Sequence, residues 1–250
     1  MPRSVEYQAS SLGVFVLARI RLEQALADPS GTAAPKEPIG ADPSLPPAVV
    51  LDVDGTILAN SGYEAWMIGK DATVDPKTWT AYVNSVSSLA DCRRRRLLRD
   101  AEARGVKLFD VSNPTVEEEE GTTMNLERLG LPRGGAVDTV RSDPKPLDWG
   151  SAHGTRRAQV AGDQLSDLVG DYRGTEAERL KVMVEHKDRW GRERIRLSTP
   201  SYGAFESAPF TPDVKLSEAD QRTAKRAVRE AWPGAPDRRA PHGPARWSLA

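Results

Sequence analysis

The sequence predicts an α/β domain in which helices flank a parallel sheet and an extra helix precedes it. Two apolar runs, 47–52 (PAVVLD) and 106–111 (VKLFDV), are typical of strands buried on both faces. Helical segments alternate with these runs, which favours right-handed crossovers within one sheet. The single cysteine, Cys92, excludes an internal disulfide framework.

Each expected element has a local signal. Apolar residues of 5–27 recur every three to four positions, which predicts an amphipathic helix that Pro29 ends. Residues 29–47 are rich in Pro, Gly, Ala and Asp and should form a surface linker. Asp75 and Pro76 suit the N-cap and the first position of a helix. The other expected elements are helices at 93–104, 115–129 (with a capping box of Thr115 and Glu118) and 217–230, and a half-buried strand at 192–197.

Three regions follow from this organisation. Residues 1–45 are the N-terminal helix and linker, residues 46–210 the main domain, and residues 211–250 a helix followed by a polar tail expected to be poorly ordered. No stretch approaches the roughly 20 apolar residues of a membrane span. The apolar segment 12–20 is short, is interrupted by Arg19 and lacks a cleavage site, so it fails as a signal peptide.

Charge argues against a nucleic-acid partner. The 35 basic and 36 acidic side chains give a formal charge of −1. The four arginines Arg93 to Arg96 suggest a patch for a polyanion, but a solvated helix face is the interpretation we adopt at this net charge. Binding to nucleic acid through this run would weaken steeply with salt.

The residues that carry chemistry follow the first expected strand. Asp52 and Asp54 leave its carboxyl end, where ligand sites form in open α/β sheets. One carboxylate can attack phosphorus, and the other can protonate the leaving oxygen and then activate water. The alternative is a loop with two solvated acids.

Two further segments strengthen the functional interpretation. Ser112 ends the second strand, where its hydroxyl can donate to a phosphoryl oxygen or cap a helix. The loop 162–167 (GDQLSD) carries Asp163 and Asp167, which can complete an oxygen-only Mg²⁺ site with Asp52, although such a loop is more often a turn.

Together these motifs resemble the haloacid dehalogenase-like superfamily, and specifically the class C acid phosphatases, over roughly residues 5–210. The matching segments are 45–54, 60–66, 75–79, 105–109, 125–130, 149–151, 154–157, 162–167 and 202–206. The resemblance implies a Rossmann-like parallel sheet and Mg²⁺-dependent hydrolysis of small phosphomonoesters, with nucleotides as candidate substrates. Relatives are usually exported, but neither a signal peptide nor a lipobox is expected here, and neither compartment nor oligomeric state follows.

The resemblance also assigns roles to individual residues. It implies that Asp52 is the nucleophile and a metal ligand, and that Asp54 is the general acid/base and binds the metal through its backbone. It implies that Ser112 and Asn113 hold phosphate. It makes Asp163 a metal ligand, with Asp167 in support.

Several positions depart from the family pattern. The first motif usually reads DVDET, whereas Gly55 stands here in place of Glu, and Ala59 replaces an acid. Pro114 stands where the family usually has Arg, and it can neither donate a hydrogen bond nor carry charge. His153 replaces the cationic Lys of WGSDKG and is mostly neutral at pH 7, so it is expected to bind substrate only in acid; Lys145 is a candidate substitute.

The largest departure is one of length. Only seven residues separate Gly154 from Gly162, and a crossover plus a strand needs a dozen or more. We therefore expect either that Asp163 extends directly from a helix end or that the sheet lacks this strand. These departures motivate the alternative function, a catalytically impaired relative that acts as a binding or scaffold domain.

Aromatic residues lie between the first two motifs. Trp66, Trp79 and Tyr82 occupy the region where superfamily members place elements that cover the substrate. They could stack on a nucleobase or an aryl ester, but we favour packing in the core. Cys92 has no partner motif and is expected to be an inert thiol.

Overall fold

A computed structural model of the chain describes residues 5–28, 30–33, 42–89, 92–112, 115–131, 140–141, 155–169, 174–198, 203–209 and 216–227. Its α-helices are α1 (Val5–Ala27), α2 (Ser61–Lys70), α3 (Pro76–Asn84), α4 (Cys92–Glu102), α5 (Glu119–Arg128), α6 (Glu176–Glu185) and α7 (Glu218–Ala227). Its strands are β1 (Pro47–Asp52), β2 (Lys107–Ser112), β3 (Val140–Arg141), β4 (Arg156–Gly162) and β5 (Arg194–Arg196), and the short 3₁₀ helices are η3 (Leu165–Asp167), η4 (Lys187–Arg189) and η5 (Ala204–Ser207). Among these described helices, none combines the length and the apolar character needed to cross a membrane.

The strands form one parallel sheet in the order β3-β2-β1-β4-β5. The first strand, β1, is central: it pairs Asp52 with Val111 of β2 on one side and Leu51 with Ala161 of β4 on the other. The chain winds outward through β2 and β3 and then returns beside β1 as β4. The carboxyl ends of β1, β2 and β4 therefore meet at one edge, at the switch in winding direction where ligands bind in open α/β folds.

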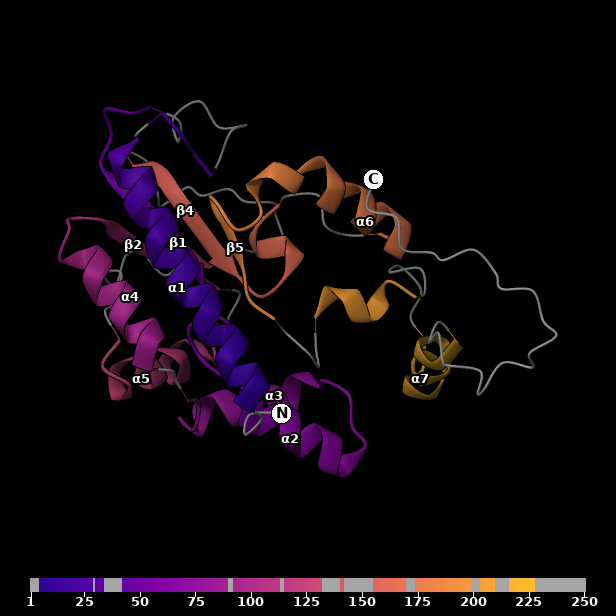
Figure 1. Ribbon diagram of the computed structural model, residues 1–250. Coiled ribbons are helices and arrows are strands. Elements are labelled where there is room, and N and C mark those ends of the chain that lie inside the picture. Colours follow the sequence, from indigo (N-terminus) through magenta and orange to yellow (C-terminus); the bar gives the residue numbers. More distant parts are fainter. Residues whose placement is uncertain are drawn as a thin grey trace, which may run out of the picture.

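Helices cover the sheet according to the alternation of side chains along β1. Val49 and Leu51 pack into a core formed with α1 and α4, whereas Ala48 and Val50 pack into a smaller core on the opposite face. Figure 1 shows α1 crossing the sheet with α4 beside it, and α2 and α3 below them. The N-terminal helix thus supplies buried core side chains, namely Phe15, Ala18 and Leu22.

The strand β4 corrects our expectation for the segment before Asp163. Arg156–Gly162 is a strand along which every residue is buried, so the sheet has kept it and Asp163 does not extend from a helix end. The polar side chains of β4 give the segment no apolar pattern, so its sequence does not indicate a buried strand. These side chains can be buried because they bond carbonyls that lie far away in the chain. The Arg156 guanidinium donates to the carbonyls of Ala25 (3.0 Å) and Gly31 (3.1 Å), and the Gln159 amide donates to that of Ala18 (3.0 Å).

Arg156 is expected to contribute strongly to stability. Its guanidinium satisfies a carbonyl in the last turn of α1, which has no partner within the helix, and the residue is only 2% exposed. We expect Arg156→Met to lower the free energy of unfolding by about 2–3 kcal/mol, as for the loss of buried hydrogen bonds to a charged group. Urea denaturation measures this, with the exposed Arg192→Met as the matched control. Equal stability of the two variants would contradict the assignment.

The arginine run in α4 is not a uniformly solvated face, and that expectation is wrong for Arg94. This side chain is 2% exposed, donates to the Ile57 carbonyl (3.1 Å) and lies over the Phe15 ring at 5.4 Å. Burial follows because the guanidinium stacks on an aromatic face while satisfying a backbone acceptor. Arg96, in contrast, is solvated.

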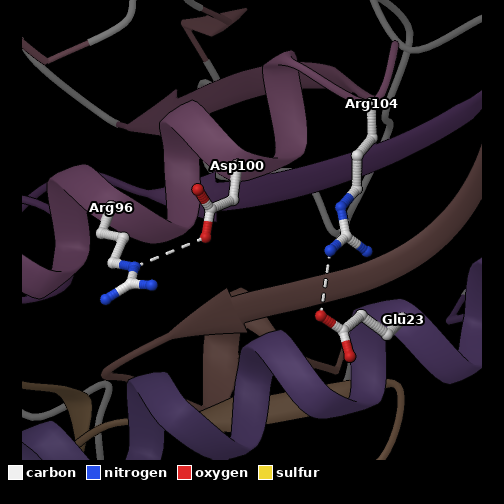
Figure 2. A network of polar contacts seen from close by, with 4 residues as sticks. All are labelled: Glu23, Arg96, Asp100 and Arg104. Carbon is white, nitrogen blue, oxygen red and sulfur yellow. Dashed lines mark hydrogen bonds and ion pairs between the residues drawn. The ribbon is translucent and has the colours of Figure 1, made fainter.

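Exposed ion pairs lie on the surface near the contact of α1 with α4. Figure 2 shows Arg104 reaching Glu23 of α1 (3.0 Å) and Arg96 reaching Asp100 one turn along α4 (3.7 Å). The paired side chains are 38–72% exposed, so each pair contributes little to stability. The contact between these helices therefore depends on their apolar residues.

Most helix expectations are confirmed in their essentials. Asp75 caps α3 by accepting from the backbone N–H groups of Lys77 and Thr78, with Pro76 at the first position. The expected helix at 115–129 begins only at Glu119. The Glu118 carboxylate does accept from the Thr115 N–H (2.9 Å), but residues 116–118 form a turn, so the capping box was only half right.

Candidate active site

Three strand ends bring the predicted site residues to one edge of the sheet. Asp52 is the last residue of β1, Ser112 is the last of β2, and Asp163 directly follows β4. Because β1 pairs with both other strands, these positions are neighbours. Asn113 and His153, together with Pro114 and Lys145, lie outside the described residues.

Three carboxylates converge at this edge. Asp52, Asp163 and Asp167 each place an oxygen within 4.8 Å of the others. Asp163 is 1% exposed. The Asp52 Oδ2 atom is buried and makes no hydrogen bond within the described part of the chain. Carboxylates this close repel one another unless protons or a cation lie between them, and an all-oxygen set suits a hard divalent cation.

Burial and mutual repulsion perturb the acids of this cluster. Burial raises the pKa of Asp52 well above its usual range, and the negative charges of Asp167, Asp163 and Asp54 raise it further, while the nearby Thr56 hydroxyl opposes the shift. Burial also raises the pKa of Asp167 to about 6, against the lowering effect of its hydrogen bonds. Without a cation, the cluster therefore retains protons at pH values where free carboxyls have lost them.

The loop after β4 holds Asp167 in the cluster. Its Oδ2 accepts from the Gln164 N–H (2.7 Å) and its Oδ1 from the Ser166 hydroxyl (3.0 Å), which closes the short helix η3. The side chain packs directly on Gly162, where a Cβ atom would lie 2.3 Å from that of Asp167. The family resemblance implied only support from Asp167, whereas the structure places its carboxylate within 4.8 Å of the other two, as the acidic loop itself suggested.

A tight loop positions Asp54 beyond β1. The N–H groups of Ile57 and Leu58 both donate to the Val53 carbonyl (2.9 and 2.8 Å), and the Gly55 N–H donates to the Leu58 carbonyl (2.9 Å). Gly55 has φ 87°, a left-handed conformation that disfavours side chains. This gives a backbone reason for glycine at a position where the family usually has Glu.

Sequence reasoning missed a polar partner of Asp54. The Asn60 amide donates to Asp54 Oδ1 (3.0 Å), and the Ser88 hydroxyl donates to Asn60 Oδ1 (3.2 Å). Asn125 in turn accepts from the Ser88 N–H (3.1 Å). The sequence offered only the match of segment 60–66 to the family pattern, which says nothing about a contact between Asn60 and Asp54.

The aromatic residues form one packed group around buried Tyr63. Its ring centroid lies 5.6 Å from that of Trp66, 5.3 Å from that of Trp79 and 5.5 Å from that of Tyr82. Burial raises the pKa of Tyr82, and the charge of Asp54 adds to this, so the hydroxyl lies in the electrostatic field of the site. Trp66 is 41% exposed and presents an indole surface to solvent.

Comparison with known proteins identifies the family and the fold of the chain. The family model described as HAD superfamily, subfamily IIIB (acid phosphatase), matches residues 23–204. The structure of the class C acid phosphatase from Bacillus anthracis is similar, with 24% identity and a TM-score of 0.79, and the match covers 92% of this chain and 94% of that one. The tungstate-bound structure of the class C acid phosphatase from the same organism gives 23% identity and a TM-score of 0.78, covering 92% and 93%. At these identities the structural likeness shows the shared fold.

Proposed function

Because the chain belongs to the HAD subfamily IIIB acid phosphatases, it is a phosphomonoester hydrolase, and we propose that it acts through Asp52 with a bound Mg²⁺ ion. The observation that carries this proposal is the convergence of Asp52, Asp163 and Asp167, each with a carboxylate oxygen within 4.8 Å of the others, together with a buried Asp52 Oδ2 atom that has no hydrogen-bond partner among the described residues. Three mutually repelling carboxylates at a sheet edge lower stability, so a purely structural role does not explain them. The substrate is a small phosphomonoester, with nucleotides proposed as one class.

Asp52 is the proposed nucleophile. A bond forms between its carboxylate oxygen and phosphorus while the bond from phosphorus to the ester oxygen breaks, which leaves an aspartyl-phosphate. Water then attacks the same phosphorus, phosphate departs and the Asp52 carboxylate is regenerated. Placement at the end of the central strand gives the nucleophile a rigid backbone on both sides.

Asp54 is the proposed proton carrier. In the first step its proton passes to the ester oxygen, which takes the electron pair of the broken bond and leaves as an alcohol. In the second step the Asp54 carboxylate takes a proton from the attacking water and is ready for another cycle. Its neighbours are the Asn60 amide and the tight loop around Gly55.

Substrate binding is proposed for Ser112, Asn113 and His153. Ser112 is the last residue of β2, and β2 pairs with the strand β1 that ends at Asp52. His153 would assist only in acid, when the imidazole is charged. The tungstate bound by a B. anthracis relative is a tetrahedral oxyanion like phosphate, and tungstate inhibition competitive with substrate would support an equivalent site in this chain.

The residues present fit a divalent cation. The side chains of Asp52 and Asp163 and the backbone of Asp54 would hold it, with Asp167 in support. When bound, Mg²⁺ neutralises charge between the anionic nucleophile and the anionic substrate. The hard all-oxygen donor set and the partnerless Asp52 Oδ2 are the features that favour this ion over a softer metal.

Mg²⁺ is expected to raise the melting temperature, and more strongly at pH 7.5 than at pH 5. Burial raises the pKa of Asp167 to about 6 and that of Asp52 well above its usual range. The contribution of these two carboxyls to the stability of the metal-free fold is therefore fully present below their unfolded pKa, about 4, and is lost as pH rises through their folded pKa. Mg²⁺ must displace these protons, so its binding strengthens over the same interval. Thermal unfolding with and without Mg²⁺ measures the difference.

Two variants sharpen this measurement. Asp163→Asn should lose most of the Mg²⁺-dependent rise in melting temperature. The control, Asp188→Asn, changes an exposed carboxylate in η4 and should keep it. The same rise at both pH values, or in both variants, would place the cation elsewhere.

A further inference from the structure

We propose that Asn60 is a positioning residue that orients the proton carrier Asp54, and that Ser88 and Asn125 hold Asn60 in place. The inference rests on the proposed function, because it assigns a purpose to contacts with Asp54. These three residues are at most 2% exposed. They form a continuous chain of hydrogen bonds that runs from the loop after β1 to helix α5.

The direction of the hydrogen bonds defines which oxygen of Asp54 can carry the proton. A carboxylate oxygen only accepts, so the NH₂ group of Asn60 must face Asp54 Oδ1 and its carbonyl oxygen must face Ser88. A proton on Oδ1 would collide with the donated amide hydrogen. The transferable proton of Asp54 is thereby confined to Oδ2, and rotation of the carboxyl is restrained.

The side chain of Asn60 bonds Asp54 and does not cap its own helix. It is the N-cap residue of α2, and its carbonyl accepts from the N–H groups of Tyr63 and Glu64. Asparagine is among the favoured N-cap residues because its side chain can bond the first free N–H groups of a helix. Here the side chain makes no such bond and turns to Asp54 instead. A role confined to helix capping does not explain why the Asn60 side chain points to Asp54.

Ser88 is fixed from two directions. Ala59, which precedes Asn60, and Leu89, which follows Ser88, exchange backbone hydrogen bonds (2.7 and 3.2 Å). This pairing holds the backbone of Asn60 beside that of Ser88. From the other side, Asn125 accepts from the Ser88 N–H, and Arg128 donates to the Ser88 carbonyl. The Ser88 hydroxyl donates to Asn60 and holds the orientation of its amide, and the Ser88 side chain also hydrogen-bonds with Tyr82.

Asn125 anchors the chain of hydrogen bonds to the rigid body of the fold. It is completely buried, and its NH₂ group donates to the carbonyls of Val83 (3.0 Å) and Gly121 (2.9 Å). Helix α5 approaches the end of α3 so closely that a Cβ atom on Gly121 would lie 2.3 Å from Asn84 Oδ1. The position of Asp54 Oδ1 is therefore restrained by contacts that extend to α3 and α5, as well as by its own loop.

The test compares two substrates that differ in their need for a proton. An alkyl phosphate expels a basic alkoxide and depends on Asp54 as acid, whereas 4-nitrophenyl phosphate expels a stable phenolate and does not. The ratio kcat/KM reports the first phosphoryl transfer for both. General acid catalysis contributes about 10²–10⁴-fold, so we expect Asn60→Ala to lower kcat/KM about 10-fold or more for the alkyl ester and less than about 3-fold for the aryl ester.

Companion variants keep the proposal falsifiable. Ser88→Ala removes one oxygen and should show the same selective loss in weaker form, even if Asn60→Ala does not fold. Ser88→Thr keeps the hydroxyl and should retain the wild-type ratio. Ser87→Ala is the control, because that exposed serine hydrogen-bonds, among the described residues, with Ser85 in its own turn. Equal losses for both substrates, or none, would overturn the proposal. Wild-type activity that survives Asp54→Asn with both substrates would instead refute the proposed role of Asp54 itself.

Discussion

Asp52→Asn is expected to abolish turnover while making the metal-free protein more stable. Loss of a nucleophile should lower kcat/KM by about 10³-fold or more, as when other enzymes lose theirs. The native carboxylate is costly at pH 7 because burial and three neighbouring acids raise its pKa. A neutral amide of the same shape relieves that repulsion, so the melting temperature without Mg²⁺ should rise.

Because activity should fall while the melting temperature rises, a loss of catalysis can be distinguished from a loss of folding. Initial rates on an aryl phosphate and thermal unfolding at pH 7 measure the two effects, with the exposed Asp188→Asn expected to change neither. In the wild type, a partition ratio between water and added methanol that is the same for several leaving groups would report a common aspartyl-phosphate. Persistent turnover in Asp52→Asn would exclude Asp52 as the nucleophile, whereas a wild type without turnover would favour a binding role for the domain.

Gly162→Ala is expected to disrupt the acidic cluster. A Cβ atom there would lie 2.3 Å from Asp167 Cβ and 2.6 Å from its Oδ2, so the carboxylate must leave its place. It would also lose its hydrogen bonds from Gln164 and Ser166. We expect a loss of about 1–3 kcal/mol in the free energy of unfolding, typical of overpacking. Activity should fall by about 10–100-fold, as when support around a metal site is removed.

A second substitution tests the cause. Gly162→Ala combined with Asp167→Gly removes the colliding atoms and should recover stability in urea denaturation, but not Mg²⁺-stimulated activity. Gly69→Ala is the control, because no atom lies within 4 Å of its Cβ position and alanine favours the helix there. Failure of the double variant to recover stability would show that strain at Gly162 has another source.

Local patterns were sufficient for the elements that lie closest to the chemistry. The apolar run of β1 predicted a buried strand, and its end placed Asp52 and Asp54 at the edge where ligands bind. The cap formed by Asp75 and the bounds of α1 were equally accessible, because a cap or an amphipathic face depends on residues a few positions apart.

Local patterns failed where buried polar groups have distant partners. Arg156 and Gln159 interrupt the apolar pattern of β4, yet both side chains donate hydrogen bonds to carbonyls of α1 and its flank more than 120 residues away. Arg94 was assigned to solvent, but the Phe15 ring and the Ile57 carbonyl bury it. A polar side chain can be buried when it is paired, and pairing over such separations is not a property of a sequence window.

Residue types and their order along the chain predicted acids at strand ends, a parallel sheet to hold them and resemblance to a phosphatase family. Tertiary contacts show that the Asp167 carboxylate lies within 4.8 Å of Asp52 and Asp163, and that the Asn60 side chain bonds Asp54 instead of the first turn of α2. Residue type and spacing along a strand act locally and are written in the sequence. The orientation of a carboxylate depends on which donors and neighbours the whole fold brings within about 3 Å of it.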